Sequence, residues 1–204
     1  DKAIQCLEKD LPLQVKALGE GHIEIAETYM QLGVVHEKMG EYDVALDYVG
    51  KALSIRAEKL HGNDPKLAST YTNAGHLYNL KKDFSNAILF YDKAVKVQVL
   101  AVGDEHPDVA ELYDVIGSVY ALNLDDDSAA KYYLMAIAIF ESSFGKEHSR
   151  LAAPYNRLAS LYDEGHLEKY ELALEYYLKE LAVSSSTLGK DHPSMALLYE
   201  RIAE

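Results

Sequence analysis

The sequence of 204 residues is poor in residues that would cross-link a chain or anchor it in a membrane. Its single cysteine, Cys6, excludes an intrachain disulfide and fits a reducing, intracellular compartment. We expect Cys6 to contribute to packing, because it lies within an apolar helical pattern. No apolar run approaches the ~20 residues that span a bilayer, and no signal peptide is evident. The protein is therefore expected in the cytoplasm.

Basic residues are also few. Lysine and arginine number 20 against 33 aspartates and glutamates, so the formal net charge is −13. Nucleic acids and anionic membranes both bind to basic surfaces. Neither is therefore expected as a partner.

Short motifs of enzyme active sites are missing as well. The sequence has no G-x-x-x-x-G-K-[ST], G-x-G-x-x-G, H-E-x-x-H or G-x-S-x-G. Its carboxylates are spread along the chain, without a pair suited to general acid and base catalysis. We predict no enzyme activity and no cofactor.

The dominant feature of the sequence is a repeat with a period of 42 residues. The same residue type returns at this interval in four sets: Ala26, Ala68, Ala110 and Ala152; Tyr29, Tyr71, Tyr113 and Tyr155; Gly33, Gly75 and Gly117; and Ala45, Ala87 and Ala129. A fixed period of this size is typical of a solenoid, in which each repeat contacts its neighbours. The sequence predicts one array over residues 1–204.

The period divides the array into four complete repeats and two partial ones. The predicted ranges are 1–20 for the second helix of a truncated repeat, 21–62, 63–104, 105–146 and 147–190 for repeats one to four, and 191–204 for the start of a further truncated repeat. Two extra residues of repeat four fall within Glu164–Lys169. The chain reads as a fragment of a longer protein.

Apolar residues at three- and four-residue spacing predict two helices in each repeat. We expect turns at Gly40-Glu41, Lys82-Asp83 and Leu124-Asp125, with the run Asp125-Asp126-Asp127 as the cap of the next helix. The spacing of Gly33 and Ala45, which recurs in the following repeats, predicts that the two helices approach closely at these residues. Tyr91, Tyr133 and Tyr177 are expected to fill the space toward the next repeat. Pro12 predicts a kink or a break near Asp10, and Pro154 predicts a late start or a distortion of the first helix of repeat four.

A second motif joins successive repeats. It reads Leu-Gly-x-x-His at Leu18–His22, and returns at Val102–His106, Phe144–His148 and Leu188–His192, with Asp64 in place of the histidine at the remaining joint. The glycine predicts a left-handed helix end, and the histidine or aspartate predicts a helix cap. A zinc site is not expected, because histidines one repeat apart cannot converge on one ion.

The paired helices with these small and aromatic positions resemble the tetratricopeptide repeat, whose usual unit has about 34 residues. The 42-residue unit and the L-G-x-x-H-P joint resemble the repeats of kinesin light chains and nephrocystin-type proteins. The resemblance implies an all-α, right-handed superhelix of antiparallel helix pairs. It also implies a non-catalytic scaffold that binds a peptide or helix of a partner protein in a concave groove, as a cargo adaptor with a cytoskeletal or ciliary association.

In kinesin light chains an asparagine pair precedes the small residue of the first helix. The corresponding positions, and those one turn further on, would line the groove. They include Gln31, Glu37, Thr72, Asn73, His76, Asn79, Asp114, Ser118, Asn156, Arg157, Ser160 and Asp163. Amides such as Asn73 and Asn156 can both donate to and accept from a peptide backbone. Acidic residues outnumber basic ones here, so a polar or basic ligand is expected; the alternative is a plain solvated face.

Two other functions fit the same resemblance. Long repeats of this type also form sensor arms of signalling ATPases and of bacterial regulators. Alternatively, the apolar helix faces at the ends of the fragment could stack on a second copy, which would make the chain a self-assembly module. The sequence alone leaves both open.

Overall fold

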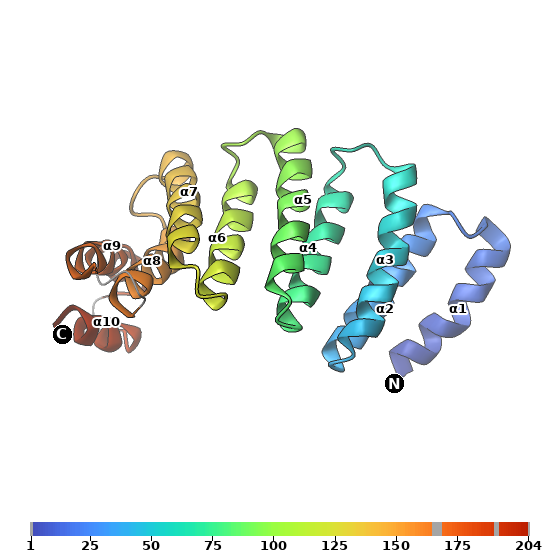
Figure 1. The fold of residues 1–204 in the computed structure, drawn as a ribbon, viewed down its shortest axis with the longest axis horizontal. Helices are drawn as coiled ribbons and strands as arrows, with labels where there is room; N and C mark the ends of the chain where they lie inside the picture. The colour runs from blue at the N-terminus through green and yellow to red at the C-terminus, as the bar shows by residue number, and fades with distance from the viewer. Residues whose placement is uncertain (1, 165–168, 190–191, 204) are drawn as a thin grey trace. The chain divides into compact units, whose positions relative to one another are not determined.

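The computed structural model describes residues 2–164, 169–189 and 192–203. These residues form ten α-helices and one short 3₁₀ helix, with no strand among them (Figure 1). The predicted all-α class is therefore confirmed. No helix of the described part of the chain is long and apolar enough to cross a membrane. The chain falls into two compact units, residues 1–103 (unit 1) and 104–204 (unit 2), and each unit is described by itself.

Unit 1 contains one helix followed by two helix pairs. The helices are α1 Lys2–Leu18, α2 Ile23–Lys38, α3 Tyr42–Lys59, α4 Pro65–Leu80 and α5 Phe84–Val102. Helices α2 and α3 form the first pair, and α4 and α5 form the second. The core between them is built largely from small residues, since Ala26, Ala45 and Ala52 are fully buried beside Val49 and Leu77. Small residues let the paired helices approach closely.

Unit 2 continues the same pattern. Its elements are α6 Pro107–Leu122, α7 Asp126–Phe144, the 3₁₀ helix Ser149–Leu151, α8 Ala152–Glu164, α9 Tyr170–Leu188 and α10 Ser194–Ala203. Helices α6 and α7 form one pair, and α8 and α9 form the other. Larger side chains fill this core, among them Tyr133, Phe140, Tyr155 and Tyr177.

The turns within the pairs lie where the sequence places them. Gly40, Lys82 and Leu124 stand one period apart and have positive φ angles of 77°, 60° and 60°. A left-handed residue reverses the chain at the end of a helix, and glycine adopts this conformation most readily. Asp125 caps α7 by accepting a hydrogen bond from the Ser128 amide at 3.1 Å. The turn of repeat four lies within Glu164–Lys169, largely outside the described residues.

The joints between repeats are capped as predicted. The Nδ1 atoms of His22, His106 and His148 accept hydrogen bonds at 3.2–3.3 Å from the amide two residues further on. Asp64 does the same at 2.8 Å. At three joints the glycine differs from the expected left-handed helix end. Gly103, Gly145 and Gly189 have φ of 93°, 83° and 87° and ψ of 161°, 159° and 154°, a region that is essentially restricted to glycine.

Helix α1 differs from the sequence expectations in two respects. The helix runs unbroken from Lys2 to Leu18 with Pro12 inside it, so the break, which was expected near Asp10 as the alternative to a kink, does not occur. Cys6 is exposed and does not pack in a core. It stands one period before Tyr48, which stacks on His36 of its own helix pair, and α1 has no such pair in this chain.

Pro154 has the expected effect on α8. This helix has 13 residues, whereas α2, α4 and α6 have 16, and a short 3₁₀ helix precedes it. Because α8 begins at Ala152, Pro154 falls in its first turn, where the missing amide hydrogen breaks no helical hydrogen bond.

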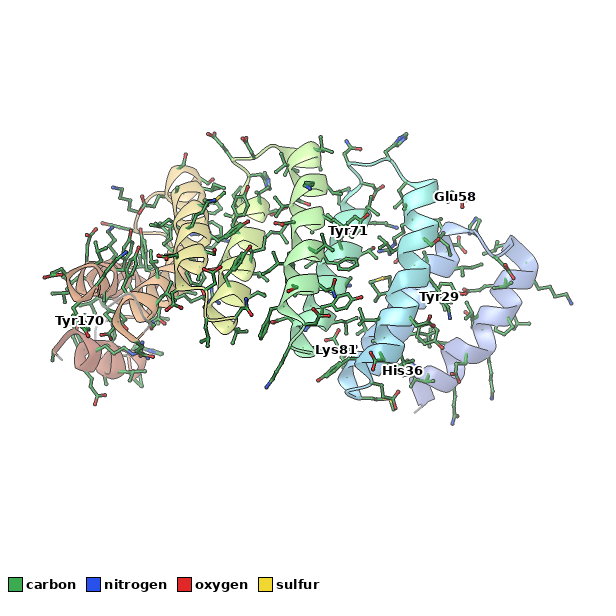
Figure 2. The ribbon with its side chains drawn as sticks, viewed as in Figure 1. Tyr29, His36, Glu58, Tyr71, Lys81 and Tyr170 are labelled. Atoms are coloured by element: carbon green, nitrogen blue, oxygen red, sulfur yellow. The ribbon has the colours of Figure 1, made fainter. Side chains whose placement is uncertain are left out.

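Aromatic rings fill the space between the helices of each pair. His36 stacks on Tyr48 at 5.4 Å and Tyr78 stacks on Phe90 at 5.2 Å, with Tyr29 beside the first pair of rings. Tyr29 and His36 are labelled in Figure 2. Equivalent stacks in unit 2 include Tyr120 with Tyr132 at 5.4 Å. The aromatic positions therefore hold each pair together.

The glycines of the first helices have a further counterpart besides the expected alanine. A Cβ atom added at Gly75 would lie 3.0 Å from the ring of Tyr91, and one at Gly117 would lie 2.7 Å from the ring of Tyr133. The tyrosines therefore cover the glycine of their own repeat, whereas the sequence placed them toward the next repeat. The alanine contributes its backbone, with the Ala129 carbonyl oxygen 3.2 Å from the added atom at Gly117.

This contact predicts opposite effects for the same substitution at two glycines. Gly117→Ala should lower the free energy of unfolding by about 1–3 kcal/mol, because the new methyl group overlaps the Tyr133 ring. Gly50→Ala lies in the exposed middle of α3 with no atom within 4 Å, and should raise it by about 0.5–1 kcal/mol. Urea unfolding followed by circular dichroism measures both. Equal effects of the two substitutions would contradict the proposed packing.

Candidate functional site

The twelve residues predicted to bind a partner all lie on the first helix of a pair. In unit 1 they are Gln31 and Glu37 on α2, and Thr72, Asn73, His76 and Asn79 on α4. In unit 2 they are Asp114 and Ser118 on α6, and Asn156, Arg157, Ser160 and Asp163 on α8. Within each unit, the structure places several of these residues close to one another. The predicted residues of unit 1 and those of unit 2 have different neighbours.

A hollow in unit 1 has a volume of about 670 Å³. We call it the unit 1 pocket. Apolar side chains form much of its wall: Leu7 from α1, and Met30, Val34 and Val35 from α2. Met30 is 8% exposed and Val34 is 39% exposed, so the wall ranges from buried floor to open rim. The exposed thiol of Cys6 also borders the pocket.

Two amide side chains face the same pocket. Gln31 lies on α2 and Asn73 lies on α4, and the two stand one period apart at equivalent positions of successive repeats. Neither amide forms a hydrogen bond with any other residue that the structure describes. Each can therefore donate to and accept from an extended peptide backbone.

A buried arginine lies at the base of the pocket. Arg56 on α3 is only 3% exposed. Its guanidinium donates to Thr70 Oγ1 at 2.5 Å, to the Lys66 carbonyl at 3.1 Å and to Glu27 Oε2 at 2.8 Å. The ammonium group of Lys66 donates to the other Glu27 oxygen at 2.8 Å. These bonds connect α2, α3 and α4.

The charge at the base of the pocket is compensated within the protein. The hydrogen bond from Lys66 and the nearby Arg56 lower the pKa of Glu27, so this carboxylate stays ionised at neutral pH. Sequence reasoning missed Arg56. The indication in the sequence was that Phe140, an apolar residue, stands at the equivalent position two periods further on.

The other predicted residues of unit 1 do not line the pocket. The Glu37 carboxylate lies 3.5 Å from His76 Nε2, and the Thr72 hydroxyl donates to the Ala68 carbonyl of its own helix at 3.0 Å. Asn79 Oδ1 is buried and has no hydrogen-bond partner within the described part of the chain. Of the six residues predicted here, only Gln31 and Asn73 border the hollow.

The charged and amide residues predicted in unit 2 are bound to other side chains. Asp114 pairs with Arg157. Burial raises the pKa of the Asp114 carboxyl, and the Arg157 charge opposes this shift. Asn156 Nδ2 donates to Glu180 Oε2 at 2.8 Å. Burial raises the pKa of Glu180 too, while the hydrogen bond from Asn156 opposes the rise.

The remaining predicted residues of unit 2 join a hydroxyl network. Tyr177 lies 3.3 Å from Ser160 and donates to Asp163 at 3.3 Å, while Arg201 donates to Ser160 at 2.6 Å and to the Tyr177 oxygen at 3.1 Å. Ser118 donates to the Asp114 carbonyl of its own helix at 3.0 Å. Two smaller hollows, of about 370 and 450 Å³, lie beside this network. Their polar side chains are mostly occupied by one another.

Comparisons with known proteins identify the repeat. The family model of the tetratricopeptide repeat matches residues 1–58, 24–99 and 66–142. A search of curated protein sequences found no match.

Several solved structures share the fold. BtubC (BKLC) from P. vanneervenii is 23% identical with a TM-score of 0.76, over 98% of this chain and 79% of that chain. A putative kinesin light chain from Podosopora anserina with nearly identical TPR-like repeats is 19% identical with a TM-score of 0.73, over 89% of this chain and 85% of that one.

Aspartyl phosphate phosphatase F from Bacillus subtilis is 20% identical with a TM-score of 0.72, over 98% of this chain and 52% of that one. At these identities the structural likeness shows the fold alone. The family model covers well over half of the sequence, and the structure is the repeated array of helices predicted from it. The chain belongs to the tetratricopeptide repeat family.

Proposed function

We propose that the chain is a non-catalytic protein-interaction scaffold that binds a peptide segment of a partner at the unit 1 pocket. Tetratricopeptide repeats are in general scaffolds that bind proteins. The observation that supports this site is the pair of amides, Gln31 and Asn73, which border an open hollow of about 670 Å³ and have no hydrogen-bond partner among the described residues.

The same proposal extends to the chemistry and role of the partner. The net charge of −13 favours a polar or basic partner segment and disfavours nucleic acid and anionic membranes. The resemblance to kinesin light chains supports a role as a cargo adaptor in the cytoplasm, with residues 1–204 as one array of repeats. Neither a cofactor nor a metal is needed for such binding.

The predicted residues of the two units differ in their hydrogen bonding, and this difference reduces the set of residues that we expect to bind the partner. In unit 2, Asp114 Oδ2 pairs with Arg157 and Asn156 bonds to Glu180, so a ligand would have to break these bonds to reach the paired atoms. The other oxygen of Asp114, Oδ1, is buried and has no partner within the described part of the chain. In unit 1, Gln31 and Asn73 can bond to a ligand without first losing an existing hydrogen bond. We therefore place the contact with the partner in unit 1 and give the polar residues of unit 2 a structural role.

Removal of the two amides should abolish binding and leave the fold intact. Gln31 is exposed and Asn73 is half-buried, so Gln31→Ala with Asn73→Ala should change the melting temperature little. The partner captured from cell lysate by the unmodified chain should then be lost, as measured by quantitative mass spectrometry of the bound fraction.

The matched control is Gln5→Ala with Asn123→Ala, which removes two exposed amides that do not line the pocket. This control should retain the partner. If the Gln31 and Asn73 variant retained every partner at the level of the control, the unit 1 pocket would be excluded as the binding site.

Asn156→Ala should affect stability and leave partner binding unchanged. The substitution leaves the half-buried Glu180 carboxylate without its donor, and should lower the free energy of unfolding by about 1–2 kcal/mol at pH 7. The bond stabilises the ionised carboxylate, and Glu180 already has a raised pKa. The loss should therefore shrink as the pH falls through the folded-state pKa of Glu180, because the protonated group has less need of the donor.

Thermal melts of the variant and of the unmodified chain between pH 4 and pH 7 test this expectation. Asn123→Ala is the control, since its amide is exposed at the end of α6. Loss of the partner without any loss of stability would instead make Asn156 a binding residue.

A further inference from the structure

We propose that the outer stripe of α5 binds an acidic amphipathic helix of a partner protein. The stripe consists of Leu89, Lys93, Lys96 and Leu100. None of these residues lines the unit 1 pocket. The proposal therefore goes beyond the proposed function, because it gives the chain a second site whose partner has a different chemistry.

The four residues form a single line along α5, the green helix labelled in Figure 1. Their spacing of four, three and four residues places them on one face of a helix with 3.6 residues per turn. Leu89 is 48% exposed and Leu100 is 69% exposed. The equivalents of Leu89, Lys96 and Leu100 on α3, α7 and α9 are exposed too, so these positions stay outside the contacts between helices in every repeat.

The stripe differs in chemistry from the equivalent face of the other second helices. The equivalents of Leu89 are Asp47, Lys131 and Glu175, and those of Leu100 are Glu58, Ser142 and Ser186. Among these four helices, α5 alone thus has leucine at both ends of this face. A helix that covers both leucines removes them from water, which is favourable in proportion to the apolar area buried.

Lysine occupies one position of this face in three of the four repeats. Lys51, Lys93 and Lys179 each lie over an aromatic ring of their own helix pair. Two of them also bind a carboxylate one turn earlier on the same helix. Lys51 Nζ lies 2.6 Å from Asp47, and Lys179 Nζ lies 2.7 Å from Glu175.

Lys93 has no such carboxylate, because Leu89 stands one turn earlier on α5. Neither Lys93 nor Lys96 forms an ion pair within the part of the chain that the structure describes. Asp92 carries the nearest negative charge in the sequence. It is half-buried, and burial raises the pKa of its carboxyl while the Lys96 charge opposes the rise. The stripe therefore offers two cations without a bound carboxylate, placed between two leucines.

The distribution of charge allows an acidic partner at this surface. Residues 1–103 hold 12 lysines and arginines against 14 aspartates and glutamates, so the acidic excess of the chain lies mainly in unit 2. Carboxylates that approach Lys93 and Lys96 meet little net repulsion from unit 1. Exposed ion pairs contribute little affinity, but they select and orient the partner. The leucines supply the apolar burial.

The spacing of the stripe favours a helix as the partner. From Leu89 to Leu100 the stripe extends about 16 Å, at 1.5 Å per residue. A helix packed along α5 can repeat the same spacing, with leucines over the leucines and glutamates at the lysines. Side chains on one face of an extended strand recur every ~6.6 Å and fall out of step with the stripe.

The test uses fluorescent helical peptides and the chain of 204 residues. The probe has about 18 residues, with leucine, glutamate, glutamate and leucine at spacings of four, three and four and with alanine or glutamine elsewhere. Two matched peptides carry alanine in place of both leucines, or lysine in place of both glutamates. Fluorescence anisotropy measures the affinity of each peptide.

The leucine and glutamate peptide should bind saturably, and each matched peptide should bind at least ~10-fold more weakly. The first substitution removes apolar burial, and the second places cations against Lys93 and Lys96. Absence of saturable binding, or equal affinity of the three peptides, would overturn the proposal.

Leu89→Glu gives α5 the ion pair that α9 already has. The new carboxylate should bind Lys93, as Glu175 binds Lys179, and should lower the affinity for the probe at least ~10-fold. Val44→Glu is the matched control, because it adds the same charge at a residue of α3 that is 41% exposed and lies outside the stripe. Melting curves check that both variants are folded. Equal affinity of the two variants would contradict the proposal.

A charge swap tests the role of the lysines. Lys93→Glu with Lys96→Glu should lose the glutamate peptide and bind the lysine peptide at least ~10-fold more tightly than the unmodified chain does. Lys9→Glu with Lys131→Glu changes the charge by the same amount at two exposed residues outside the stripe, and should keep the original preference. An unchanged preference in the variant at Lys93 and Lys96 would reject the stripe as the binding surface.

Two further measurements separate the stripe from other sites and occupants. Gln31→Ala with Asn73→Ala should bind the probe as the unmodified chain does, whether or not the proposed function holds. Loss of the probe in this variant would place it in the unit 1 pocket and overturn the proposal. Sedimentation equilibrium without peptide should give the mass of one chain. A dimer that Leu89→Glu dissociates would identify a second copy as the occupant and reject the partner helix.

Discussion

Close contact between a small residue on one helix and a bulky residue on its partner sets the geometry of every pair. A Cβ atom at Gly33, Gly75 or Gly117 would lie within 3.1 Å of Val49, Tyr91 or Tyr133. A helix surface can approach this closely only where no side chain intervenes. The residues of the first helix that lie outside this contact, such as Gln31 and Asn73, can then differ from one repeat to the next.

That freedom explains why similar repeats present different surfaces. Gln31 and Asn73 share a repeat position with Val115 and Arg157, and the four residues contribute different chemistry. In unit 1 the amides border an apolar wall. In unit 2, Arg157 is drawn to Asp114, and the neighbouring polar residues bond to one another. A binding surface can therefore be local to one part of an array whose backbone is repeated throughout.

The sequence predicts the fold well because its determinants are periodic. Small residues, turn residues and capping histidines recur at a fixed interval, and each acts on its own repeat. The site depends on pairs such as Asn156 with Glu180, or Glu27 with Arg56, which are 24 and 29 residues apart and do not follow the period. The exposure of Cys6 likewise could not be read from its own apolar pattern, because that pattern does not say which helices pack against α1.

Hydrogen-bond satisfaction explains why the twelve predicted residues are not equivalent. A polar side chain that already has a partner must lose that bond before it can bind a ligand, so its net contribution to binding is small. Asn156 and Asn73 look alike in sequence, yet only Asn73 lacks a partner among the described residues. Arg56 extends the same argument, because it neutralises Glu27 at the base of the pocket and so leaves an apolar wall beside two available amides. The capacity to bind thus follows from which polar groups the fold leaves unpaired.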